Sequence, residues 1–158
     1  MATQLIRIPL TYPPIPECNN LRAYRILLPL NVEVGSGRWV QLPFRLDPGS
    51  DFTTISIADA RANGIHFSTR IRVFPKTAAG KALKPSFLSP IWLLFPSLPQ
   101  LWFQSHCLFS PYPLKRCLLS LNEIVPHFLV RSERATPAYP DGSIVLRLRK
   151  DHGGKQRP

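Results

Sequence analysis

Residues 26–50 read ILLPLNVEVGSGRWVQLPFRLDPGS, and this stretch decides the fold that the sequence predicts. On either side of Gly35-Ser36-Gly37, apolar residues occupy every second position. A period of two is typical of a β-strand with one buried face, and a short glycine-containing break between two such runs is typical of a hairpin. The alternating positions are Ile26, Leu28, Leu30, Val32 and Val34, then Val40, Leu42, Phe44 and Leu46. We therefore expect a β-hairpin whose second strand ends at Asp47.

The hairpin delivers this acid into the loop Asp47-Pro48-Gly49-Ser50. Because glycine accepts a positive φ, Gly49 is expected to bring its backbone N–H close to the Asp47 carboxylate. Function then depends on whether Asp47 meets a second carboxylate. The competing interpretation is an exposed acid at the end of a hairpin, since Asp is a common turn residue.

The remaining chain predicts short strands separated by turns. Ser56 followed by Asp59 is typical of a helix N-terminus, and Gly64 suits the end of that helix. Strands are expected at residues 52–55, 70–74, 87–88, 91–95, 101–103, 117–119, 128–131 and 143–150, with a helical turn at 121–125. The predicted fold class is all-β, a small, mostly antiparallel, barrel-like domain with one or two short helices.

Composition indicates one globular domain, since 44% of the 158 residues are apolar, and the 18 prolines favour short strands and turns. We expect residues 1–23 to form an extended proline-rich N-terminal segment, residues 24–150 the folded domain, and residues 151–158 a disordered basic tail. The net charge of +11 is typical of proteins that contact nucleic acid, an anionic membrane or an acidic partner, but a basic surface with no such partner is the preferred interpretation. No basic arm appears, so nucleic acid is a less favoured partner than peptide or protein.

Several other classes of site and location are excluded. Cys18, Cys107 and Cys117 form neither a disulfide framework nor a zinc motif, which favours a reducing, cytoplasmic compartment. The four histidines lack metal-ligand spacing, and no G-x-S-x-G or phosphate-binding loop is present. The most apolar window, residues 87–103, is interrupted by three prolines, which argues against a membrane span. No metal, organic cofactor or membrane is expected.

Two segments resemble the signature segments of the retropepsin-like aspartic proteases. The first is Phe44-Arg45-Leu46-Asp47 followed by Gly49-Ser50. The second comprises an apolar run, a serine and a helical turn, with the matching residues Cys117, Leu118, Leu119, Ser120 and Asn122. Between them, where the family has its flap hairpin, lie Thr77, Ala78, Ala79 and Gly80. The resemblance covers residues 25–148 and is greatest to the short single-lobed bacterial members.

This resemblance implies a closed β-barrel of one lobe and an aspartic endopeptidase acting on peptides or proteins. Asp47 would be catalytic, Pro48, Gly49 and Ser50 would shape the acid loop, and residues 77–80 would close over the substrate.

Such hydrolysis uses two carboxylates that share one proton around a single water. This chain has one acid loop, because Asp51 is expected to point elsewhere and Asp141 lacks an apolar approach strand. The expected enzyme is a two-fold symmetric homodimer joined through its C-terminal strand and acid loop.

Two residues depart from the family pattern. Pro48 stands where the family has Thr or Ser, whose hydroxyl and N–H link the two acid loops; proline supplies neither. Ser120 stands where the family has glycine, and its side chain is expected to crowd the floor of the loop. The alternative hypothesis is therefore a catalytically weak or inactive module with the same fold that binds peptides.

Overall fold

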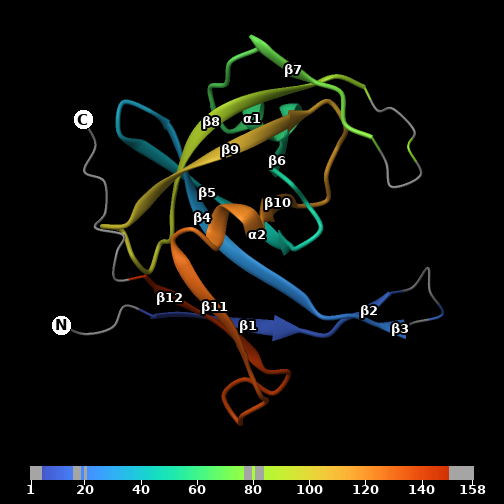
Figure 1. Ribbon diagram of the computed structural model, residues 1–158, viewed down its shortest axis with the longest axis vertical. Helices are drawn as coiled ribbons and strands as arrows, with labels where there is room; N and C mark the ends of the chain where they lie inside the picture. The colour runs from blue at the N-terminus through green and yellow to red at the C-terminus, as the bar shows by residue number, and fades with distance from the viewer. Residues whose placement is uncertain (1–4, 16–18, 20, 77–79, 81–83, 150–158) are drawn as a thin grey trace.

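The computed structural model describes residues 5–15, 19, 21–76, 80 and 84–149, almost all of them in or between β-strands (Figure 1). The two helices are α1 (Ile57–Ala62) and α2 (Leu121–Ile124). The strands are β1 (Leu5–Thr11), β2 (Pro14–Ile15), β3 (Leu21–Arg22), β4 (Arg25–Gly35), β5 (Arg38–Asp47), β6 (Thr53–Ser56), β7 (Ile71–Val73), β8 (Ser86–Leu94), β9 (Trp102–Ser110), β10 (Cys117–Ser120), β11 (Phe128–Glu133) and β12 (Ser143–Leu148).

The central strands close into a barrel. Strands β4, β5, β10, β6, β9 and β8 are neighbours in that order, and pairing of β4 with β8 completes the circle. An all-β closed barrel with short helices, as the sequence predicts, is therefore confirmed.

The hairpin of β4 and β5 forms where the period-two pattern predicts it. Its register pairs Leu30 with Leu42 and Leu28 with Phe44, and all four side chains are buried. The turn places Gly35, Ser36 and Gly37 at φ values of 100°, 52° and 73°. Such backbone favours glycine, which explains the Gly-Ser-Gly break.

The barrel has an approximate internal two-fold relation between residues 25–73 and 86–133. Strand β5 pairs in parallel with β10, and β6 pairs in parallel with β9, so each half lends a strand to the other. Strands β6 and β10 meet in antiparallel fashion at Thr54 and Leu118. Each half contains a helix capped by a serine, Ser56 for α1 and Ser120 for α2, and ends in a strand, β7 or β11. Asp47 and Ser110, which end β5 and β9, are therefore equivalent positions.

Two strands differ from the sequence prediction. Strand β9 runs to Ser110 rather than ending at residue 103, because the small residues Ser105 and Cys107 take its inward positions and hide the apolar alternation. Strand β8 continues through Pro90, although the prediction divides it. Strand β8 pairs with β7 before this proline and with β4 after it. At Pro90 itself neither strand is paired with β8, so the missing N–H of the proline costs no hydrogen bond there.

A three-stranded extension lies beside the barrel (Figure 1). Strand β12 is its middle strand, with β1 on one side and β11 on the other. Strand β1 also reaches the barrel by pairing with β4. Residues 5–11 of the predicted N-terminal segment thus contribute a strand to this sheet. The predicted tail, residues 151–158, lies outside the described residues.

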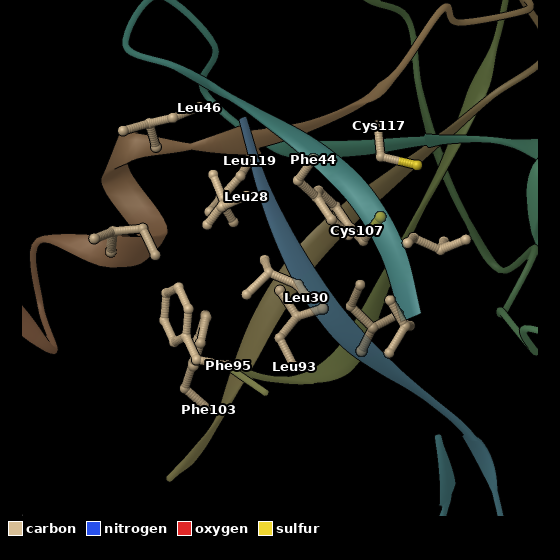
Figure 2. Packing of buried hydrophobic residues seen from close by; sticks show 14 of the residues in the cluster. Leu28, Leu30, Phe44, Leu46, Leu93, Phe95, Phe103, Cys107, Cys117 and Leu119 are labelled. Carbon is tan, nitrogen blue, oxygen red and sulfur yellow. The ribbon is translucent and has the colours of Figure 1, made fainter. Parts of the chain in front are cut away.

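The core fills the barrel and continues under the acid loop. Figure 2 shows side chains from several barrel strands gathered there, including Leu30, Phe44, Leu93 and Leu119. These four side chains are fully buried. Because Phe44 and Leu119 sit on the paired strands β5 and β10, the core fixes the strand ends that carry the candidate site.

Candidate active site

The loop after β5 is a tight turn that holds the Asp47 carboxylate. The Gly49 N–H donates to Asp47 Oδ1 at 3.0 Å, and the Ser50 N–H donates to the Asp47 backbone oxygen at 3.3 Å. Gly49 does not have the positive φ that we expected. The Asp47 side chain receives the Gly49 N–H without that conformation, so the expected contact forms although the expected backbone conformation does not.

Ser120 forms a hydrogen bond that joins this loop to the other half of the barrel. Its buried Oγ donates to the Ser50 carbonyl at 2.6 Å and accepts from the Asn122 N–H at 3.2 Å. Its own N–H donates to Thr53 Oγ1 at 3.4 Å. The expectation that Ser120 crowds the loop is wrong, because the hydroxyl is bonded to the loop that it touches and caps α2.

The two segments singled out from the sequence lie side by side. In the parallel register of β5 and β10, Asp47 is opposite Ser120, and Arg45 is opposite Leu118. Leu119 is buried in the core, whereas Leu118 is half-buried. The site is thus built from residues more than seventy positions apart in sequence, such as Asp47 and Asn122.

The sequence reasoning gave no role to Arg45, which is the nearest cation. Its Nη2 lies 3.9 Å from Asp47 Oδ2, and the two side chains are 42% and 31% exposed. The sequence contained the information needed to find it, because residues two apart on a strand share a face, and Arg45 stands two positions before Asp47. The acid is therefore reachable from solvent and is flanked by a positive charge.

The equivalent loop of the second half has no acid. The Tyr112 N–H donates to Ser110 Oγ at 3.1 Å, as the Gly49 N–H does to Asp47. A proline follows in both loops, Pro111 and Pro48. Residues 111–116 read PYPLKR, so this half supplies no carboxylate from its loop.

The flap prediction falls mostly outside the described part of the chain. Thr77, Ala78 and Ala79 are not described, and Gly80 is, with a φ of 78°. All four lie in the connection between β7 and β8, which pair as an antiparallel hairpin. Strands β7 and β8 thus flank the predicted flap residues in sequence, and the flap itself stays a prediction.

Two cysteines lie in the core, away from solvent. Cys107 and Cys117 are free and buried, and burial raises the pKa of both thiols, that of Cys117 to about 12. Within the described ranges, no three His, Cys, Asp or Glu side chains are grouped to hold a metal ion. The same ranges contain no helix with the length and apolarity to cross a membrane.

Comparison with known proteins supports the fold. No family model matches the chain, and no curated protein matches it. Among solved structures it is similar to the crystal structure of a retropepsin-like aspartic protease from Rickettsia conorii, with a TM-score of 0.58 and 12% identity. The match covers 93% of this chain and 92% of that one. The chain therefore has a retropepsin-like fold.

Replacing Ser120 by alanine should loosen the acid loop. The Ser50 carbonyl would lose its donor and α2 its cap, so we expect a loss of about 1–2 kcal/mol in the free energy of unfolding. The matched control is Ser56→Ala, which removes the equivalent cap from α1 without touching the loop. Urea unfolding gives the stabilities, and hydrogen exchange reads the Gly49 amide. Faster exchange in Ser120→Ala alone is expected; equal exchange in both variants would show that Ser120 does not hold the loop.

Proposed function

We propose that this protein is an aspartic endopeptidase that works as a homodimer, with Asp47 of each chain supplying half of the catalytic pair. The observation that carries this proposal is that Asp47 ends β5 in a bonded, partly exposed loop while its equivalent, Ser110, is not an acid. One lobe of a retropepsin-like fold thus supplies one carboxylate.

The chemistry requires two carboxylates close together. When two such groups approach within about 3 Å, they share a proton, because both cannot ionise easily. The ionised group removes a proton from the attacking water, and the protonated group donates to the oxygen of the scissile carbonyl. Those titrations belong to the pair. In this scheme Gly49 and Ser120 are positioning residues, since they hold Asp47 and its loop.

The dimer surface proposed here differs from that expected from the sequence. Both edges of the C-terminal strand β12 are paired within the chain, with β1 and β11. A second chain could join β12 only by displacing one of these neighbours. Strand β11 has a pairing partner on one side only among the described residues, and its Leu129 is 39% exposed. We therefore place the dimer contact along β11 and the acid loops.

Peptide cleavage tests the proposal directly. Purified wild-type protein should cleave extended peptides from a mixed library at acidic to neutral pH, and Asp47→Asn should reduce the rate by several orders of magnitude. Asp51→Asn is the matched control, because it makes the same change at an exposed acid four residues away. No cleavage by the wild type, or equal loss in both variants, would reject Asp47 as the catalytic group.

The second candidate function is a peptide-binding module that does not cleave, and Pro48 favours it. This residue has no N–H and no hydroxyl, so it cannot exchange hydrogen bonds with the acid loop of a second chain. Less firmly joined loops would misplace the two carboxylates, and small displacements of reacting groups lower rates steeply.

Pro48→Thr tests how much this residue weakens the dimer. A threonine supplies the backbone N–H and the hydroxyl that proline lacks. Two regained hydrogen bonds of about 1 kcal/mol each should lower the dissociation constant of the dimer by at least tenfold, measured by sedimentation equilibrium. Pro111→Thr, in the equivalent loop of the other half, is the control. An unchanged or weaker dimer in Pro48→Thr would show that this loop does not join the two chains.

A further inference from the structure

Arg45 lies on the face of β5 that also carries Asp47. Alternate residues of β5 point outward, and on that face Arg45 follows Gln41 and Pro43 and precedes Asp47. The neighbouring strands add Leu27 and Leu118, which are opposite Arg45 in the two registers. The arginine therefore stands between the candidate catalytic acid and the outer surface of the hairpin, with an apolar residue on each side.

A shallow groove continues along this face away from Asp47. Its volume is about 300 Å³, and its walls include Leu27, Pro29, Gln41, Pro43 and Arg116. Leu27 links the groove to Arg45, because these two residues are paired across β4 and β5. The groove thus has mostly apolar walls with Arg116 among them, and Arg45 lies outside it, next to Leu27 on the side of Asp47.

The charges on this face are unbalanced. No Asp or Glu is among the residues that line the groove. The contact of Arg45 with Asp47 is 3.9 Å long, whereas a charge-assisted hydrogen bond is about 2.7–2.9 Å. A guanidinium has five N–H donors, so Arg45 retains donors for another carboxylate. The Arg45 side chain is 42% exposed and can be reached by a ligand.

We infer that Arg45 is a specificity-determining residue that selects peptides carrying a Glu or Asp side chain beside the scissile bond, with flanking apolar residues lying in the groove toward Arg116. This inference rests on the proposed function, because it names the substrate class of that site. Without a cation, the anionic catalytic pair would repel an acidic substrate side chain. Arg45 offsets this repulsion, because its guanidinium lies 3.9 Å from the Asp47 carboxylate.

Nucleic acid fits this groove less well than an acidic peptide. The lining residues include no aromatic side chain on which a base could stack, and Arg116 is the one cation among them. An apolar strip beside cations instead matches an extended chain of mixed acidic and apolar residues.

The experiment compares two peptides that differ only by Glu or Gln beside the scissile bond. Each is made in a cleavable form and in a form with a reduced, uncleavable bond. Fluorescence anisotropy with the uncleavable pair measures binding to wild type, Arg45→Leu and the control Arg38→Leu. Arg38 is an exposed arginine at the other end of β5, so its variant changes the net charge equally.

We expect wild type and Arg38→Leu to bind the Glu peptide about tenfold more tightly than the Gln peptide, and Arg45→Leu to lose this preference. Equal binding of the two peptides by wild type would overturn the inference. Equal loss of preference in both variants would also overturn it, because the effect would then come from overall charge. RNA that displaces the Glu peptide from wild type and Arg45→Leu alike would indicate a general anion surface and would likewise overturn it.

The cleavable pair separates this inference from the proposed function. If the Glu preference in binding depends on Arg45 but neither peptide is cut, the inference stands and the proposed protease activity fails. If both peptides are cut at equal rates by wild type and bound equally, the protease activity stands and the selectivity fails.

Discussion

The parallel pairing of β5 with β10 is the constraint on which the rest of this structure depends. It brings Ser120 opposite Asp47 and places the buried Leu119 opposite Leu46, so the core lies directly under the site. The bond from Ser120 Oγ to the Ser50 carbonyl then joins the acid loop to the second half of the barrel. A long-range strand pairing thus holds the loop that carries the Asp47 carboxylate.

The internal two-fold relation places an acid in one loop and a serine in the equivalent loop, Asp47 and Ser110. Both halves make a turn with proline after the side chain that accepts a backbone N–H, from Gly49 at Asp47 and from Tyr112 at Ser110. The turn and its hydrogen bond are therefore repeated in both halves, whereas the carboxylate is present in one of them. A serine hydroxyl bonded in this way satisfies the turn but does not act as a carboxylate at neutral pH. The second carboxylate of the proposed pair must come from another copy.

Local patterns predicted much of this fold. The alternation in residues 26–46, the Gly-Ser-Gly turn, and Ser56 with Asp59 each specify a structure within a few residues, and all three form as expected. Asp47 could be singled out because it follows such a pattern. The conformation of Gly49 was missed, since a proline followed by a glycine also suits a turn with a positive φ at the glycine, which this loop does not adopt.

Features that depend on distant contacts could not be derived in this way. The role of Ser120 depends on the Ser50 carbonyl, which is seventy positions away in sequence. The internal relation was hidden because the halves share little besides a proline in each loop and a serine cap on each helix. Neither β9 nor the middle position of β12 follows from local pattern, since Ser105 and Cys107 interrupt one alternation and strand order is a tertiary property.

The most direct test of the shared active site is to mix wild-type protein with Asp47→Asn. At concentrations where chains are dimeric and exchange freely, a threefold excess of the variant should reduce wild-type cleavage to about a quarter, because mixed dimers carry one acid. The same mass of an unrelated protein should have no effect. Unchanged wild-type activity, with mixed dimers demonstrated in the same sample, would contradict an active site that needs Asp47 from both chains.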